Sequence, residues 1–385
     1  MTEQPNIIIV GASARAAAFS ALRAGMRPHA IDLFADCDLA DACPAVKIEH
    51  YPQDFEQALA TAPEAPWIYT GGLENYPDLI ARMESLRPLY GNGADVLRGI
   101  RNPELLAARL AAAGFMMPEI RSSPPEVGLE RQWLRKPRRS SAGLGIRWLD
   151  AAASPAHENR YYYQRHIPGQ SRSAVFLASR GGSELLGVTD QQSGVPEFPD
   201  EPFLYAGSEV FHDCGEGLEQ PLDELGDALT REFSLCGLFN IDYVDDGRQI
   251  WPLEVNPRYS ASIEVLEHSL GRNFLALHIS AFEPGFKGPY DCRISHRPRH
   301  VAKSIVYARS DCVVTPGLHE LRKSWNVERL LPCLADIPRT GDRILRGQPV
   351  ATALADGGIA AGSSADMQRL LQERVKSVEQ TLLPA

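Results

Sequence analysis

The segment WPLEVNPR, residues 251–258, alternates apolar and polar side chains. Side chains of a β-strand point to alternate faces, so Glu254 and Asn256 share one face of the strand that this pattern predicts. A solvated acidic strand face is the alternative interpretation. The apolar residues interleaved with the polar pair favour a partly buried sheet instead.

A second predicted strand, FNIDY at 239–243, precedes this segment and carries Asp242. If the two strands pair, Asp242, Glu254 and Asn256 converge. Oxygen ligands on a rigid sheet suit Mg²⁺, which binds through carboxylates and nucleotide phosphates. We therefore predict a magnesium site here, with Arg258 placed to neutralise an oxygen of a transferred phosphoryl group.

A third motif lies in WLRKPRRSSAGLGIRWL, residues 133–149, where two apolar strands flank a small, polar, Gly-rich turn. Backbone N–H groups of such a turn can wrap phosphate oxygens because no side chain blocks the approach. Lys136 adds a point charge, and Ser140, Ser141 and Gly143 form the predicted phosphate grip. The GxxxxGK[ST] P-loop is absent. A surface hairpin with a solvated lysine is the alternative.

The order of these motifs, with QRHIPG at 164–169 between them, resembles the ATP-grasp superfamily over roughly residues 1–290. The resemblance implies an α/β and α+β protein that clamps ATP between two subdomains and uses Mg²⁺. The residues it implies are Lys136 on the phosphates, Gln164 and Ile167 at the adenine, Asp242, Glu254 and Asn256 on magnesium, and Arg258 near the γ-phosphate.

Two positions depart from the family pattern. A second phosphate lysine is usual before the helix that precedes the lid, but Pro103 stands there, and Arg101 is the candidate substitute. The hinge acid that usually holds the ribose is also missing, with Ser171 near its place. The Ser-x-Ser hinge formed with Ser173 is similar to that of the tyramine–glutamate and pyrrolysine-pathway ligases.

Three domains are expected from the length of 385 residues and from this resemblance. They are a Rossmann-like pre-ATP-grasp domain at 1–95, an ATP-grasp domain at 96–290 with a mobile lid at about 118–165, and a small β-containing C-terminal domain at 291–385. The local patterns predict strands at 6–10, 29–33, 67–69, 161–167, 172–177, 237–244, 249–255, 301–307 and 350–354, and helices at 55–60, 102–113, 222–235 and 366–383.

The first domain is predicted to hold substrate rather than nucleotide. Its loop GASAR, residues 11–15, lacks the full GxGxxG of a dinucleotide site. By similarity to ATP-grasp proteins, this loop and GGLEN at 71–75 face the ATP site. Ser13 and Arg15 are then candidates to grip a substrate carboxylate, and Glu74 an amine. A tight turn and a capping acid are the alternatives.

Composition narrows the function classes further. A net charge of −10 argues against a broad nucleic-acid surface, and the basic stretch at 293–300 is read as a solvated linker. Seven scattered cysteines without a CxxC pair indicate reduced thiols. The N-terminus reads as a strand rather than a signal peptide, and no apolar run is long enough for a membrane span. A cytoplasmic protein is expected.

The predicted activity is that of an ATP-dependent carboxylate–amine ligase, which phosphorylates a small-molecule carboxylate to an acyl phosphate and couples it to an amine. Carboxylase-type activation of bicarbonate and a non-catalytic ATP sensor are the alternatives. No nucleic-acid or membrane partner is expected. The resemblance leaves the oligomeric state open, with a homodimer as one outcome.

Overall fold

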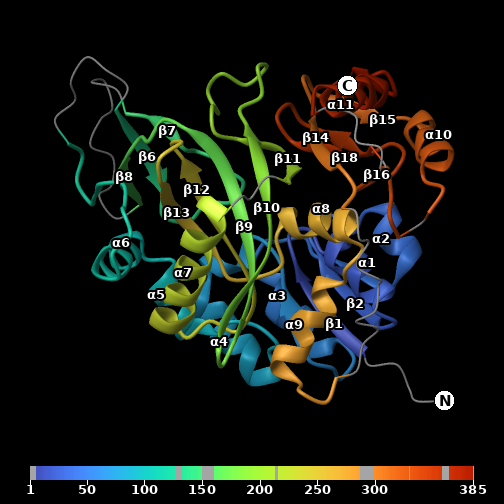
Figure 1. Cartoon of the computed structure of the whole chain (residues 1–385). Coiled ribbons are helices and arrows are strands. Elements are labelled where there is room, and N and C mark those ends of the chain that lie inside the picture. Colours follow the sequence, from blue (N-terminus) through green and yellow to red (C-terminus); the bar gives the residue numbers. More distant parts are fainter. Residues whose placement is uncertain are drawn as a thin grey trace.

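The structure, a computed structural model, describes residues 6–125, 132–149, 160–212, 216–286, 298–328, 330–357 and 364–384. Most of the basic stretch at 293–300 and part of the predicted lid lie outside these ranges. Figure 1 shows the N-terminal elements in blue beneath the red C-terminal elements, with the strands of the predicted lid on the opposite side of the view.

The N-terminal sheet is parallel, and its described strands run in the order β3-β2-β1-β4. The strands are β1 (Asn6–Gly11), β2 (Arg27–Asp32), β3 (Ala45–Lys47) and β4 (Trp67–Tyr69). The helices that connect and follow them are α1 (Arg15–Arg23), α2 (Cys37–Ala42), α3 (Asp54–Thr61), the short 3₁₀ helix η1 (Leu73–Asn75) and α4 (Pro77–Leu86). The predicted parallel α/β arrangement is confirmed, although β3 was not predicted.

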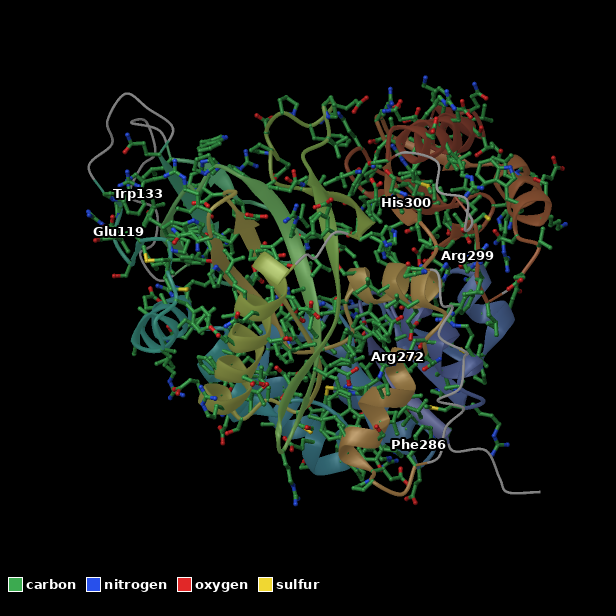
Figure 2. The ribbon with its side chains drawn as sticks, in the orientation of Figure 1. Glu119, Trp133, Arg272, Phe286, Arg299 and His300 are labelled. Carbon is green, nitrogen blue, oxygen red and sulfur yellow. The ribbon has the colours of Figure 1, made fainter. Side chains whose placement is uncertain are left out.

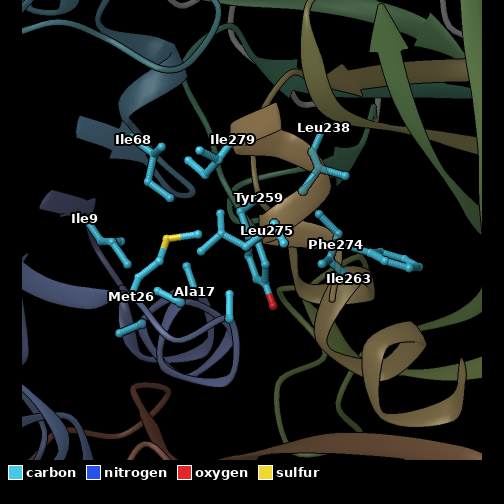
Figure 3. Packing of buried hydrophobic residues seen from close by; sticks show 14 of the residues in the cluster. Ile9, Ala17, Met26, Ile68, Leu238, Tyr259, Ile263, Phe274, Leu275 and Ile279 are labelled. Carbon is cyan, nitrogen blue, oxygen red and sulfur yellow. The ribbon is translucent and has the colours of Figure 1, made fainter. Parts of the chain in front are cut away.

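The four central residues of β1, 7–10, are all apolar and buried because helices cover both faces of its sheet. Ile7 and Ile9 pack in a cluster with α1, α8 (Ala261–Leu270) and α9 (Phe274–Phe282). Figure 3 shows this cluster, with Ile9 on one side and Phe274 on the other. Ile8 and Val10 pack in a second cluster against α3 and α4. The first cluster therefore joins the N-terminal sheet to the following part of the chain.

The central sheet is antiparallel and runs in the order β13-β12-β9-β10-β11-β14-β18-β16 within the described ranges. Its strands are β9 (Gln170–Ser179), β10 (Gly182–Ser193), β11 (Tyr205–Phe211), β12 (Gly237–Asp245), β13 (Ile250–Asn256), β14 (Val301–Tyr307), β16 (Leu334–Ala335) and β18 (Pro349–Asp356). Helix α7 (Glu216–Phe233) packs on β9 and β10. Leu222, Leu225 and Leu229 recur at helical spacing and fill the core there with Phe176 and Phe239.

A smaller antiparallel sheet, ordered β5-β8-β6-β7, corresponds to the predicted lid. Its strands are β5 (Ile120–Arg121), β6 (Trp133–Pro137), β7 (Arg147–Trp148) and β8 (Tyr161–Arg165). The predicted hairpin forms, because β6 pairs with β7. Helices α5 (Ala94–Ile100) and α6 (Pro103–Ala112) precede it, and the Asn102 side chain caps α6 as predicted by accepting from Leu105 N at 3.0 Å.

The C-terminal segment is not a detached unit, since β14, β18 and β16 extend the central sheet through pairing of β11 with β14. Its other strands, β15 (Cys312–Val314), β17 (Arg343–Ile344) and β19 (Leu382–Pro384), form a small sheet that packs with α10 (Pro316–Trp325) and α11 (Ser364–Glu379). The helix predicted at 366–383 therefore ends early, and its last residues pair with β15. In Figure 2, Arg299 and His300 lie beside this segment, far across the view from Trp133 of the lid sheet.

Two predictions made from composition can be compared with the described residues. None of their helices is both long and apolar enough to cross a membrane. Five cysteines (Cys37, Cys43, Cys236, Cys312 and Cys333) are free thiols.

Candidate functional site

A cavity of about 910 Å³ lies where the lid sheet, the central sheet, the N-terminal loops and the C-terminal strands meet. It brings together nearly all of the predicted site residues. Those that line it are Ser13, Arg15, Arg101, Lys136, Ser140, Ser141, Gly143, Gln164, Ile167, Ser171, Asp242, Glu254, Asn256 and Arg258. Glu74 is not one of the residues that line the cavity, but it contacts Arg258, which does.

The predicted magnesium set is assembled by antiparallel pairing of β12 with β13. Asp242 lies directly opposite Glu254, and Asn240 lies opposite Asn256. The Asn256 amide donates to Asp242 Oδ2 at 3.1 Å. A one-residue register shift between Tyr243 and Asp242 sets this pairing, so side chains 12 and 14 residues apart meet on one face of the sheet.

Asp242 is held by amide donors that the sequence analysis did not single out. Gln191 Nε2 donates to Asp242 Oδ1 at 2.8 Å, and Asn240 Nδ2 donates to the same oxygen at 2.9 Å. Burial, reinforced by the adjacent Glu254 carboxylate, raises the pKa of Asp242 to about 6. Two partly buried carboxylates side by side repel each other, and a bound cation would relieve that repulsion.

Glu254 is paired with Arg101, whose guanidinium donates to Glu254 Oε1 and, at 3.0 Å, to Asn75 Oδ1. Although burial opposes ionisation of Glu254, the charges of Arg101 and Lys136 hold its pKa below the usual value. Arg101 thus lies in the same cavity as Lys136. Its position is compatible with its predicted part as the second phosphate cation.

Lys136 is buried, with 6% of its surface exposed, so the alternative of a solvated hairpin lysine does not hold. Its ammonium donates to Gln164 Oε1 at 3.1 Å and lies 5.6 Å from the centre of the Tyr162 ring. Burial by itself would lower the pKa of Lys136, but Tyr162 and Glu254 raise it above the usual value. The lysine therefore stays charged inside the cavity.

Gln164 also carries an unused donor. Its side chain is 1% exposed, and Nε2 has no hydrogen-bond partner among the described residues. A buried amide without a partner costs free energy, about 1–3 kcal/mol. Ile167 lies beside it in the cavity wall. The Ser171 hydroxyl contacts Gln191 Oε1 at 3.4 Å, which leaves the predicted ribose contact a proposal.

The predicted phosphate grip at 140–145 lies against two other parts of the chain. Asn75 Nδ2 donates to Ser140 O at 3.0 Å, and Tyr205 N donates to Ala142 O at 2.9 Å. Gly143 has a φ of +73°, and a Cβ there would lie 1.9 Å from the Phe203 carbonyl oxygen. Only glycine fits that turn, and the loop lines the cavity through Ser140, Ser141 and Gly143.

Arg258 joins the central sheet to the N-terminal domain. Its Nε and Nη2 donate to Glu74 Oε1 at 3.1 and 2.7 Å, and Nη2 also donates to Asn256 Oδ1 at 3.1 Å. The second carboxylate oxygen of Glu74 is buried without a partner among the described residues. Glu74 therefore positions Arg258, and the amine contact predicted for Glu74 stays a prediction.

Arg15 is already engaged by carboxylates. Its guanidinium pairs with Glu264 of α8 and donates to Asp336 at 2.9 and 3.0 Å. Lys303 Nζ donates to the other Glu264 oxygen at 3.1 Å. This network of Arg15, Glu264, Lys303 and Asp336 links four sequence-distant segments at the cavity wall. A substrate carboxylate on Arg15 would have to replace these partners.

The residues present fit a magnesium nucleotide. Among the described residues, no three His, Cys, Asp or Glu side chains are arranged to hold a metal ion by themselves. The predicted set has two carboxylates and one amide, and Mg²⁺ in nucleotide sites completes its shell with phosphate oxygens and water. Cations at Lys136 and Arg101 face the same space, as phosphate binding requires.

Comparisons with known proteins agree with this geometry. The profile of the ATP-grasp domain matches residues 102–262. The large chain of carbamoyl phosphate synthase from Myxococcus xanthus is 23% identical over 206 residues, which are 48% of this chain and 18% of that protein.

Solved structures show the same fold over the whole chain. The L-amino acid ligase from Bacillus licheniformis aligns over 100% of both chains with a TM-score of 0.72 and 15% identity. The N5-carboxyaminoimidazole ribonucleotide synthetase from Thermus thermophilus aligns over 97% of this chain and 98% of its own, with a TM-score of 0.66 and 15% identity. At such identities the similarity establishes the fold alone.

Proposed function

Because residues 102–262 form an ATP-grasp domain and the chain has the ATP-grasp fold, we propose that it is an ATP-dependent carboxylate–amine ligase. The observation that carries the proposal is the single cavity in which the buried Lys136–Gln164 pair, the Asp242–Glu254 pair and Arg258 all meet. A nucleotide spanning these groups would present its γ-phosphate to the space in front of the N-terminal loops.

The reaction has two balanced steps. A carboxylate oxygen of the substrate attacks the γ-phosphorus, the bond to the β-phosphate oxygen breaks, and ADP leaves with an acyl phosphate remaining. An amine then attacks the acyl carbon, phosphate leaves, and the amine loses one proton. Asp242, Glu254 and Asn256 would hold Mg²⁺, which would neutralise charge on the phosphate oxygens.

The side chains of this chain contribute charge and position. Lys136 and Arg101 would stabilise negative charge on the nucleotide, and Arg258, held by Glu74, would stabilise the departing phosphate. The loop at 140–145 excludes water, which would otherwise hydrolyse the acyl phosphate. These groups require no protein nucleophile.

Phosphate release on addition of Mg-ATP tests the proposal with three substrate sets. Amino acids with small amines, amines alone, and bicarbonate are compared, and hydroxylamine is added to trap an acyl phosphate as a hydroxamate. The proposal expects release that needs a carboxylate, with hydroxamate formation. Release with bicarbonate alone would indicate a carboxylase-type activator. Nucleotide binding without release under any condition would indicate a sensor. The Glu254→Gln variant serves as the inactive control.

A further inference from the structure

Asn75, the last residue of η1, uses both ends of its side-chain amide to bridge two parts of the candidate site. Its Oδ1 accepts from Arg101 Nη2 at 3.0 Å, and its Nδ2 donates to Ser140 O at 3.0 Å. Asn75 is 8% exposed and does not itself line the cavity, whereas both of its partners do. The amide therefore acts through these partners rather than on a ligand.

Consecutive residues of η1 hold the two arginines of the cavity. Arg258 Nη2 donates to Glu74 Oε1 at 2.7 Å. Asn75 accepts from Arg101, and Arg101 in turn donates to Glu254. The side chain of an arginine has many rotamers, and two acceptors at fixed points restrict it to few of them. The N-terminal domain thus sets the direction of the cations that face the proposed phosphate site.

The loop at 139–141 makes a second contact with the same segment, one residue further along. The Arg139 guanidinium lies over the ring of Tyr76, 5.6 Å from its centre. Asn75 Nδ2 also lies 3.5 Å from Ser141 Oγ. Movement of the loop away from η1 would break these contacts and leave the buried amide of Asn75 without an acceptor, which opposes the movement.

We propose that Asn75 is a positioning residue that couples docking of the loop at 139–141 to the orientation of Arg101. The amide is planar, so its oxygen and nitrogen cannot turn independently. An amide that turned to follow a displaced loop would therefore take its oxygen away from Arg101. The inference rests on the proposed function, because the docked loop keeps water from the acyl phosphate. With the loop displaced, water would attack the acyl carbon, regenerate the carboxylate and release phosphate without product.

Replacement by aspartate breaks one end of the bridge. Asn75→Asp keeps an acceptor for Arg101 but places a carboxylate oxygen, which cannot donate, against Ser140 O. Trypsin cleavage after Arg139 is followed on the full chain alone and with Mg-ADP, and it reports how often the loop leaves its docked position. Cleavage of the variant should be about five- to tenfold faster in both states, in keeping with loss of one hydrogen bond.

A second readout is the ratio of phosphate to product. It uses saturating hydroxylamine and a carboxylate that supports turnover of the wild type. Wild type should release one phosphate per hydroxamate, whereas Asn75→Asp should release about two or more, because water reaches the acyl phosphate. A purely structural role of Asn75 would lower both rates together and leave the ratio at one.

A second variant and a matched control separate this role from folding. Asn75→Ala adds neither charge nor bulk, so it serves if the buried aspartate impairs folding. It should speed cleavage as much and should also weaken Mg-ATP binding, because Arg101 loses an acceptor. Asn326→Asp loses a similar bond, from Asn326 Nδ2 to Leu334 O at 2.7 Å, at a residue outside the cavity wall. It should leave both the cleavage after Arg139 and the phosphate ratio unchanged.

The outcomes distinguish the inference from the proposed function. Equal cleavage in wild type and both Asn75 variants, or a ratio that stays at one in a variant that is cleaved faster, would overturn the inference. Faster cleavage of the variants in a chain that releases no phosphate with any carboxylate would support the bridge and refute the ligase.

Discussion

Replacing Lys136 with Met removes its ammonium but keeps most of its aliphatic length. In the protein without nucleotide, the variant loses the 3.1 Å bond to Gln164 and leaves that buried amide oxygen unpaired. This costs about 1–3 kcal/mol of unfolding free energy. Removing a buried charge offsets part of this loss, so the unfolding free energy of the variant should fall by about 1 kcal/mol overall.

The larger effect should appear with nucleotide. A charged hydrogen bond to phosphate in a partly dehydrated cavity contributes about 2 kcal/mol, which corresponds to a roughly 30-fold change in the Kd of ATP. At an ATP concentration 100 times the wild-type Kd, wild type gains about 2.7 kcal/mol of stability from binding. The variant at the same concentration should gain only about 0.9 kcal/mol.

Urea unfolding with and without Mg-ATP measures both quantities. Lys323→Met is the matched control, because Lys323 is exposed on α10 and is not in the cavity wall. It should gain as much from Mg-ATP as wild type. If Lys136→Met also shows the full nucleotide-induced gain, the phosphate grip lies elsewhere and Lys136 is a structural residue.

Three further outcomes are expected. Glu254→Gln should lower turnover by at least about 100-fold, and excess Mg²⁺ should not restore the activity. Near-normal activity of this variant at limiting Mg²⁺ would show that Glu254 does not bind the metal. Steady-state assays should show a preference for ATP over GTP that is reduced in Gln164→Ala, and equal use of both nucleotides by wild type would mean that the base lies elsewhere. The His278 ring accepts from Leu238 N through Nδ1 and contacts Tyr90 O through Nε2, an arrangement that fits the neutral ring, and burial lowers its pKa to about 4. The neutral ring therefore contributes fully to stability above the unfolded pKa of 6.5, and this contribution is lost as pH falls toward 4. Urea unfolding should show a loss of about 2 kcal/mol between pH 7 and pH 5, and His278→Gln should abolish that loss. An unchanged pH dependence of the unfolding free energy in the variant would refute this account.

The sequence by itself predicted those features that depend on neighbours along the chain. Strand alternation places Glu254 and Asn256 on one face of β13, and the asparagine cap of α6 acts within one helical turn. The hairpin that carries Lys136 formed for the same reason. Local backbone geometry limits these contacts to very few arrangements, so a pattern of residue types is enough to predict them.

Contacts between distant segments were decided only by tertiary packing. Arg101 meets Glu254 across 153 residues, and Arg15 meets Asp336 across 321. Neither the burial of Lys136 nor that of Gln164 has a local signal, because the exposed area of a side chain depends on which elements pack over it. The sequence named most of the residues in the cavity, but which of them pair with one another followed from how the sheets and helices close around it.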